Sequence, residues 1–206
     1  MTHRMTLRHA MSFGKELIEV EKYPQIILMS MKMSVHKLRW FRAVFLWGLV
    51  FLLFSCNTAR HVEKRQTKEV YEALGLRSDR DDNVALYKEA TTWLHVRHVD
   101  GGTSRNGTDC SFLVYSLYKS VYHKTIERNS AAMLTKNCKR IDRNQLKEGD
   151  LVFFSTGGKS KSYVNHVGIF LKDTKFLHSS TSKGVIVSDL DEDYYRKTWV
   201  CGGRVR

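Results

Sequence analysis

The sequence predicts an α+β fold, in which N-terminal helices pack on a central antiparallel β-sheet. Two observations lead to this prediction. Apolar residues recur at intervals of three and four over residues 82–94 and 110–121, which is the spacing of helices with one buried face. From Gly149 onward, short runs rich in β-branched and aromatic residues alternate with glycine or charged turns, as is typical of short strands. Helices that precede a series of strands favour an α+β arrangement.

Length and charge narrow the class of protein. The 206 residues are enough for one domain with a sizeable core. The formal charge is +13, and the 26 Lys/Arg and 18 Asp/Glu beyond residue 56 still leave +8. Such a charge attracts an anionic polymer or a membrane surface. Because no basic stripe with interleaved aromatics and no zinc-finger spacing accompanies the charge, nucleic acid is not expected as a partner.

Residues 34–55 have the pattern of an export signal. A basic stretch at residues 34–42 is followed by an apolar run that ends at Phe54, the order found in signal peptides. The run is shorter than the roughly 20 apolar residues that cross a bilayer. Residues 53–56, Leu-Phe-Ser-Cys, resemble a bacterial lipobox, although the phenylalanine is bulkier than usual. We therefore expect cleavage before Cys56 and lipid modification of its thiol, with an uncleaved anchor or a plain secretory signal as the alternatives.

Two segments are expected to lie outside the folded domain. Residues 1–33 precede the export signal and end in a cluster of methionines, which indicates either a start codon placed too early or a polar extension. Residues 56–81 are rich in charge and typical of a tether, which would connect a lipid anchor to a domain at residues 82–206. No acidic run follows Cys56, so we expect a membrane-anchored protein of the bacterial cell envelope that faces the periplasm.

Local signals predict the elements of the domain in order. Asp82 is placed to cap the first helix. The glycine-containing stretch at residues 101–107 predicts a turn that leads to Asp109, a suitable cap for the second helix at residues 110–121. A polar linker is expected from there to about Glu148. Strands are then expected at residues 149–154, 166–171, 175–179, 184–188 and 201–205.

Three residues form a candidate catalytic unit. Cys110 stands at a predicted helix N-terminus, where free N–H groups and the macrodipole favour a thiolate and lower the pKa of the thiol. His166 and His178 lie in strand-like apolar runs, where they could supply a base and a group that orients the base. Each residue alone also fits a buried cysteine or a satisfied core histidine. Their combination favours nucleophilic catalysis.

Four segments of the domain form an ordered series. They are Gly101-Gly102-Thr103-Ser104 through Asp109-Cys110-Ser111, then Gly149-Asp150-Leu151-Val152-Phe153-Phe154, then His166-Val167-Gly168-Ile169-Phe170, and finally His178-Ser179-Ser180-Thr181. In this order and spacing they resemble the motifs of the NlpC-type family of bacterial cell-wall cysteine peptidases, whose fold is papain-like. The resemblance covers about residues 84–206, and it implies that Cys110 is the nucleophile, His166 the general base and His178 the residue that orients His166.

The resemblance also implies which residues contact the substrate. Asp109 and Ser111 flank the nucleophile, and His98 and Asp100 occupy the segment in which the family carries a substrate-contacting tyrosine. His98 replaces that tyrosine. A second departure is Phe112, which stands where the family has glycine and either crowds the site or changes the packing. The implied substrate is a peptidoglycan stem peptide, cut between γ-D-glutamyl and a diamino acid or at the cross-link between D-alanine and the diamino acid.

The reaction expected from these residues is acyl transfer without a cofactor. The thiolate of Cys110 attacks an amide carbonyl, and His166 takes the thiol proton and returns it to the leaving amine. No metal is expected, because neither histidine has a carboxylate or cysteine at ligand spacing. The four cysteines form no CxxC pair and leave a disulfide between Cys138 and Cys201 open. The alternatives are a non-catalytic, lipid-anchored wall-binding protein whose site Phe112 has closed, and a transferase or amidase that acts at the sugar–peptide junction.

Overall fold

The chain divides into two units, Met1–His61 and Val62–Arg206. The computed structural model describes residues 39, 40, 42, 44, 45, 47, 61–157, 160 and 163–206. The six described residues between 39 and 47 are helical and exposed. The predicted extension at residues 1–33, Cys56 and the rest of the predicted signal at residues 34–55 lie outside the described residues. In the part of the chain that the structure describes, no helix has both the length and the apolar character to cross a membrane.

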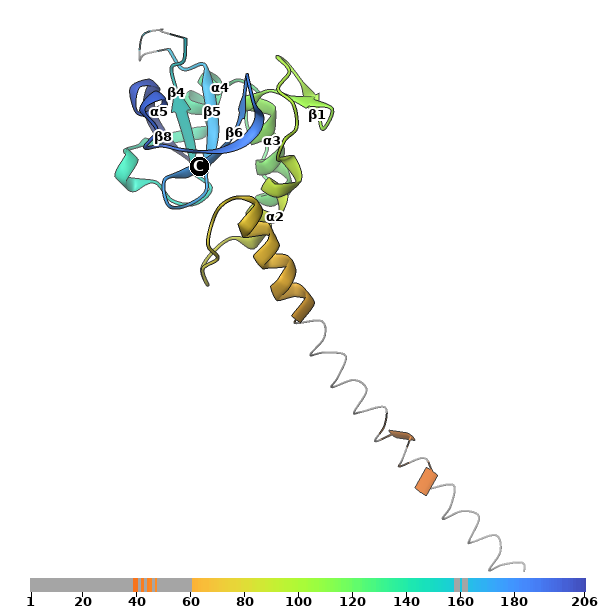
Figure 1. The fold of residues 1–206 in the computed structure, drawn as a ribbon. Helices are drawn as coiled ribbons and strands as arrows, with labels where there is room; N and C mark the ends of the chain where they lie inside the picture. Colours follow the sequence, from red (N-terminus) through yellow and green to blue (C-terminus); the bar gives the residue numbers. More distant parts are fainter. Residues whose placement is uncertain are drawn as a thin grey trace, which may run out of the picture. The chain divides into compact units, whose positions relative to one another are not determined.

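The second unit is built on a six-stranded antiparallel sheet (Figure 1). Its strands run in the spatial order β3-β8-β4-β5-β6-β7. The strands are β3 (Cys138–Ile141), β4 (Leu151–Phe154), β5 (His166–Phe170), β6 (Lys175–Ser180), β7 (Gly184–Asp189) and β8 (Trp199–Val205). Every residue of β4 is buried, because this central strand is covered on both faces.

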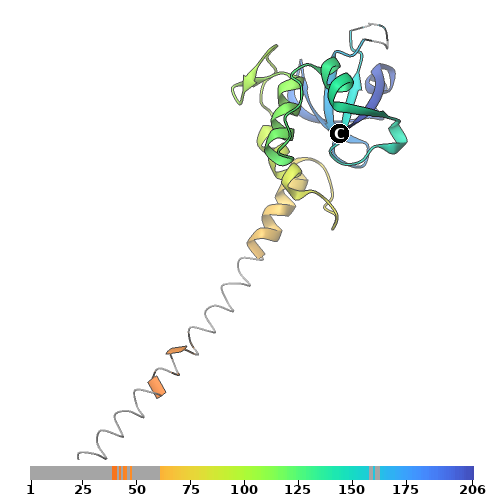
Figure 2. The ribbon, with the colours of Figure 1, turned by 180° about the vertical axis from the view of Figure 1, so that it is seen from behind.

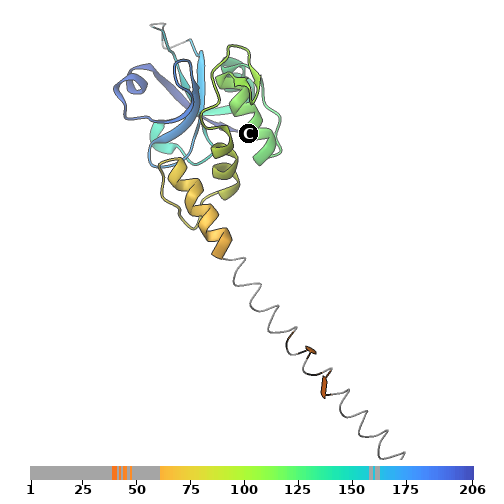
Figure 3. The same cartoon turned by 45° about the vertical axis from the view of Figure 1, so that its right-hand side comes forward.

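Helices cover both faces of the sheet. The longer ones are α2 (Val84–Trp93) and α3 (Cys110–Val121), and the shorter ones are α4 (Ser130–Ala132), the π-helix η2 (Met133–Asn137), the 3-10 helix η3 (Arg143–Gln145) and α5 (Asp193–Thr198). A two-stranded hairpin, β1 (Thr103–Ser104) with β2 (Gly107–Thr108), precedes α3. Figures 2 and 3 show α2 and α3 on one side of the sheet, and Figure 3 shows α5 on the other.

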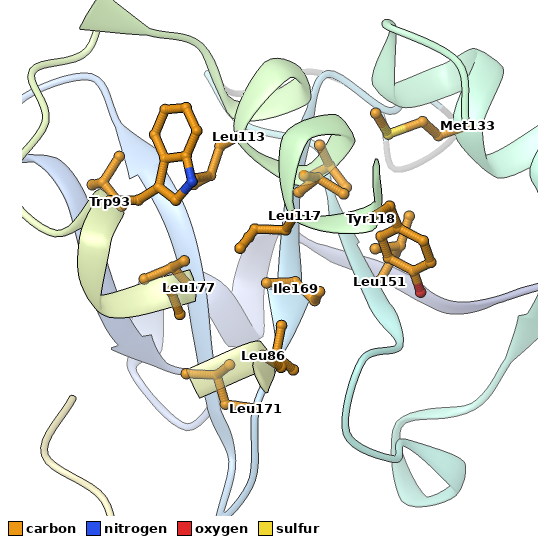
Figure 4. Close-up of a cluster of buried hydrophobic side chains, with 14 of the residues drawn as sticks. Leu86, Trp93, Leu113, Leu117, Tyr118, Met133, Leu151, Ile169, Leu171 and Leu177 are labelled. Atoms are coloured by element: carbon orange, nitrogen blue, oxygen red, sulfur yellow. The ribbon is translucent and has the colours of Figure 1, made fainter. Parts of the chain in front are cut away.

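The main core lies between α3 and the sheet. Leu113 and Leu117, four residues apart on α3, are fully buried in one cluster with Ile169 of β5 and Leu177 of β6 (Figure 4). Burial of each such side chain stabilises the fold by about 1.5–3 kcal/mol. A second, smaller cluster on the opposite face of the sheet comprises Val152, Phe154, Phe176, Leu190 and Tyr195. The α+β class, with helices first and an antiparallel sheet after them, is therefore confirmed.

The first helix starts differently from the prediction. Its cap is Asn83, whose side chain accepts a hydrogen bond from the N–H of Leu86. Asp82 is not the cap, because its carboxylate pairs with Lys172 Nζ at 2.8 Å. The second helix starts as predicted, with the side chain of Asp109 as its cap.

The predicted polar linker and the predicted tether are both partly wrong. The linker contains β3, which forms one edge of the sheet. Residues 61–73 are helical rather than an unstructured tether, and Tyr71 and Leu74 are buried in the main core. The compact unit therefore begins at Val62, not at residue 82.

Cys138 and Cys201 are both free thiols. Cys138 pairs with Val205 across β3 and β8, so Cys201 lies four residues further along β8. Four residues of strand span about 13 Å, whereas the Cα atoms of a disulfide are at most about 7 Å apart. The register of the two strands therefore excludes the disulfide that the sequence left open.

Candidate active site

Cys110 is the first residue of α3, and the loop before it fixes its place. The N–H of Asp109 donates to the carbonyl oxygen of Gly102 at 3.3 Å, so the chain doubles back directly ahead of the cysteine. Only glycine fits at position 102, since a Cβ there would lie 2.6 Å from the carbonyl oxygen of Gly107. The turn delivers Cys110, half-buried, to the start of the helix.

Asp109 and Ser111 hold the start of α3. Asp109 Oδ1 accepts hydrogen bonds from the N–H of Phe112 at 2.6 Å and from Ser111 Oγ at 2.8 Å, and the Arg128 guanidinium pairs with it at 3.3 Å. Burial raises the pKa of Asp109, but these hydrogen bonds and the guanidinium charge outweigh burial and hold the pKa below its usual range. Both side chains thus position Cys110, and their contact with substrate stays a prediction.

His166 and His178 come together from neighbouring strands. His166 opens β5, His178 lies within β6, and Nε2 of His166 lies 2.9 Å from Nδ1 of His178. Gly168 allows the strands to approach, because a Cβ there would lie 2.7 Å from the Phe176 ring. The hydrogen bond on Nε2 leaves Nδ1 of His166 available to a further group.

The sulfur of Cys110 lies near Val167 of β5, the residue that follows His166. The backbone N–H groups of Val167, Ser111 and Cys110 itself lower the pKa of the thiol, which places the sulfur near Val167 of β5. Helix α3 packs on both β5 and β6. The structure therefore places Cys110 against β5, the strand that begins at His166, and joins His166 to His178 by the 2.9 Å hydrogen bond.

Two residues that the sequence analysis did not single out hold the far side of His178. Nε2 of His178 lies 3.0 Å from Ser188 Oγ and 3.0 Å from the Tyr195 hydroxyl. Ser188 comes from β7, two residues beyond the cross-strand partner of His178, Ile186. Tyr195 comes from α5, a helix that the sequence analysis did not predict. Phe176 stacks on the His178 ring at 4.9 Å, so the imidazole is held on several sides.

Burial gives the site a neutral resting state. Burial, with the Asp109 charge as a smaller contribution, raises the pKa of the Cys110 thiol above its usual value, although the surrounding N–H groups oppose this rise. Burial and the neighbouring His98 lower the pKa of His166 to about 4. Burial also lowers the pKa of His178 well below the usual histidine value. The N–H groups at the helix start do lower the pKa of Cys110, as expected, but burial outweighs them and the net shift of the pKa is upward.

His98 and Asp100 lie beside the histidine pair. His98 Nδ1 lies 2.9 Å from Ser179 Oγ, and its Nε2 lies 3.0 Å from Asp100 Oδ1. The His98 side chain is 12% exposed, whereas the Asp100 side chain is fully exposed. Ser179 in turn donates to the carbonyl oxygen of Thr108, two residues ahead of Cys110. His98 thus links β6 to the turn before the cysteine.

Phe112 packs away from the candidate site. Its ring lies edge-on to Trp93 at 6.1 Å and stacks with Tyr115 at 6.0 Å, and the Arg128 guanidinium lies over it at 4.6 Å. Two residues of helix correspond to a rotation of about 200°, so the side chains of Cys110 and Phe112 leave α3 on different sides. The substitution of glycine by Phe112 changes the packing of the helix.

The arrangement is suited to nucleophilic chemistry. A thiol next to a neutral imidazole, which is itself oriented by a second imidazole, can attack a carbonyl group and transfer its proton in the same step. In the described part of the chain, no group of three His, Cys, Asp or Glu side chains could hold a metal ion.

Comparison with known proteins places this geometry in a family. A curated relative from Haemophilus influenzae, a probable endopeptidase NlpC homolog, is 33% identical over 121 residues, which are 59% of this chain and 62% of the relative. The murein DD-endopeptidase MepS/murein LD-carboxypeptidase of Escherichia coli K12 is 30% identical over 165 residues, which are 74% of this chain and 85% of the relative.

Solved structures agree with the sequence relatives. A crystal structure of an NlpC/P60 family protein from Bacillus cereus has a TM-score of 0.54 at 28% identity and covers 59% of this chain. A similar-to-lipoprotein NLP/P60 family protein from Staphylococcus aureus also has a TM-score of 0.54, at 25% identity, and covers 63% of this chain. The matches span only 39% and 43% of those two proteins. Residues 95–204, more than half of the sequence, match the NlpC/P60 family, and the chain therefore belongs to that family.

Proposed function

We propose that the chain is a cysteine endopeptidase that hydrolyses peptidoglycan stem peptides. The observation that carries the proposal is the position of Cys110, which stands at the start of α3 and against β5, the strand that begins at His166 of the hydrogen-bonded pair His166–His178. Membership of the NlpC/P60 family supports the same reaction class, because relatives in it are named as endopeptidases. Thiol, base and orienting group are the parts that acyl transfer requires.

In the proposed mechanism His166 acts as a general base. Nδ1 of neutral His166 takes the thiol proton while the sulfur of Cys110 attacks the amide carbonyl carbon. The oxyanion that forms accepts a hydrogen bond from the N–H of Cys110 at the helix start, and one such donor lowers the barrier by about 3 kcal/mol. His166 then protonates the leaving amine, and water, activated by the same imidazole, hydrolyses the thioester. His178 holds Nε2 of His166 throughout.

The substrate class follows from the relatives, and the bond is the open part of the proposal. Two relatives from Escherichia coli are named murein DD-endopeptidases, which favours the cross-link between D-alanine and the diamino acid. A relative from Bacillus subtilis, 31% identical, is named gamma-DL-glutamyl hydrolase, which favours the bond between γ-D-glutamyl and the diamino acid. Product analysis distinguishes the two bonds.

Digestion of purified peptidoglycan, followed by mass analysis of the fragments, tests the proposal. Wild-type protein should release fragments cut at one of the two bonds, and Cys110→Ala and His166→Ala should each abolish release. Cys201→Ala is the matched control, because this buried free thiol lies on β8 and should leave the rate unchanged. Retained cleavage by Cys110→Ala would refute the mechanism. If the wild type releases nothing but sediments with peptidoglycan, the protein is a wall-binding protein instead.

We also propose that His98 and Asp100 line the substrate groove. Asp100 is fully exposed and is the side chain that can meet a substrate directly, while His98 stands behind it with both ring nitrogens engaged. Asp100→Ala should therefore raise KM more than it lowers kcat. Asp173→Ala is the control, since this exposed aspartate lies in the turn after β5. An unchanged KM for Asp100→Ala would remove this segment from the groove.

The cell-envelope location is a proposal from sequence. The basic and apolar stretches of residues 34–55, followed by Leu-Phe-Ser-Cys, support export and lipid modification of Cys56. A lipid on Cys56 would anchor the enzyme to the membrane on the periplasmic side, next to its substrate. Labelled palmitate should enter the wild type and not Cys56→Ala, and label in the variant would show that the lipobox is unused.

A further inference from the structure

The hydrogen bonds of the histidine pair constrain where each proton lies. His166 can accept the proton of Cys110 only if its Nδ1 carries no hydrogen. A neutral imidazole carries one hydrogen, which must then be on Nε2, and this N–H donates to Nδ1 of His178 at 2.9 Å. His178 must therefore be protonated on Nε2. The competence of the base thus depends on what surrounds Nε2 of His178, which is 2% exposed.

Two hydroxyl groups lie within hydrogen-bond distance of Nε2 of His178, and each favours a different tautomer of that ring. Ser188 Oγ and the Tyr195 hydroxyl each lie 3.0 Å from Nε2 of His178. If Tyr195 donates to Nε2, His178 carries its proton on Nδ1, His166 carries its proton on Nδ1, and the base cannot accept the thiol proton. If Ser188 accepts from Nε2–H, both His178 and His166 carry their protons on Nε2, and Nδ1 of His166 is free to accept the thiol proton.

The contact between Ser188 and Tyr195 favours the tautomer in which His178 carries its proton on Nε2. Ser188 Oγ lies 3.4 Å from the Tyr195 oxygen in a geometry in which serine donates and tyrosine accepts. Ser188 then donates its hydroxyl hydrogen to Tyr195, and its lone pairs remain available to accept from Nε2–H of His178. All three groups are buried, with exposed fractions of 2% for His178, 5% for Ser188 and 8% for Tyr195, so water does not substitute readily for a missing partner.

We propose that Ser188 and Tyr195 are positioning residues that fix His178 as the Nε2–H tautomer and so keep Nδ1 of His166 free for the proton of Cys110. Ser188 is the acceptor, and Tyr195 holds the hydroxyl of Ser188 in the accepting orientation. The inference rests on the proposed function for its kinetic consequence, but the tautomer itself can be measured without substrate.

Four variants of the full chain in detergent micelles separate this role from simple packing. In Ser188→Ala the Tyr195 hydroxyl is left as the hydrogen-bond neighbour of Nε2 among the described residues and donates to it, so kcat/KM should fall about tenfold, the value of roughly one hydrogen bond. In Ser188→Ala/Tyr195→Phe the wrong donor is gone, so activity should recover part of that loss. Ser188→Thr keeps the hydroxyl and should retain activity. Tyr194→Phe, an exposed neighbouring tyrosine, is the control and should change nothing.

Nitrogen-15 NMR of labelled histidine provides the direct readout. The wild type should show His178 protonated on Nε2, and Ser188→Ala should move the proton to Nδ1; assignment uses His178→Gln. Tyr195→Phe, which preserves the ring, should keep the Nε2–H form and lose less than about threefold in kcat/KM, since Ser188 still accepts. An Nδ1–H tautomer in the wild type, or a double variant less active than Ser188→Ala, would overturn the proposal. A correct tautomer in a protein that cleaves no stem peptide would instead overturn the proposed function alone.

Discussion

The pH dependence of kcat/KM tests the neutral resting state of the site. Burial and the neighbouring His98 lower the pKa of His166 to about 4, and burial raises the pKa of the Cys110 thiol. A neutral imidazole and a neutral thiol are then the resting forms across the neutral range. Because kcat/KM follows the ionisation of the free enzyme, activity should be lost on acidification only as pH falls through the lowered pKa of His166.

The difference in kcat/KM expected between a lowered and an ordinary His166 pKa is large enough to measure. At about pH 5.5, a base with a pKa of about 4 is about 97% neutral, whereas one with the ordinary histidine pKa of about 6.5 is about 9% neutral. kcat/KM at that pH should therefore remain close to its plateau, and an unshifted base would reduce it about tenfold. His98→Gln removes the neighbour that helps to lower the pKa of His166, so the acidic limb should move to higher pH. His61→Gln, an exposed histidine in the helix of residues 61–73, is the matched control.

The assay follows release of a product from a soluble muropeptide by chromatography, from about pH 3.5 to about pH 9.5. In parallel, peptide-resolved mass spectrometry measures alkylation of Cys110 by iodoacetamide, which reacts with the thiolate. The alkylation rate should still be rising above pH 9. An acidic limb at pH 6 or above, or an alkylation rate that is already constant at pH 6, would show a thiolate–imidazolium pair and refute the reasoning.

Three substitutions test how the scaffold positions the site. Asp109→Ala removes the cap of α3 and should lower the free energy of unfolding by about 1–2 kcal/mol in urea denaturation, and an unchanged midpoint would deny Asp109 that role. Gly168→Ala places a Cβ 2.8 Å from the carbonyl oxygen of Leu177, which should displace β6. This variant should keep a native circular dichroism spectrum but lose about 100-fold in kcat/KM. Full activity would show that β5 and β6 need not approach so closely. Phe112→Gly should cost about 2–4 kcal/mol of stability by thermal denaturation without raising kcat, and a faster enzyme would show that Phe112 does crowd the site.

The sequence predicted those elements whose signals are local. Helix α3 was found with its cap, Asp109, because its apolar residues recur at helical spacing and an aspartate precedes them. The five predicted strands correspond to β4 through β8 to within about two residues, since each is an apolar run between turns. Each of these segments buries at least three residues, and this repeated burial is what produces the pattern.

The elements that the sequence missed lie at edges and carry charge. Strand β3 buries only its end residues, Cys138 and Ile141, and exposes the two basic residues between them. Helix α5 has six residues and buries only Tyr195. The helix at residues 61–73 is mostly exposed and is charged along its first half. An element that buries one or two side chains leaves no period in the sequence, so it is visible only once the sheet it contacts is known.

The charge state of Cys110 shows why the chemistry of the site could not be obtained from motifs alone. A helix N-terminus stabilises a negative charge by about 0.3–1 kcal/mol, which is less than one pKa unit at 1.36 kcal/mol per unit. Burial can shift a pKa by up to about 3–5 units, and it depends on β5 and β6, which lie more than 50 residues away in the sequence. The distant contribution therefore outweighs the local one. The mechanism proposed above therefore predicts that the thiol of Cys110 keeps its proton at rest and transfers it to His166 only as the carbonyl is attacked.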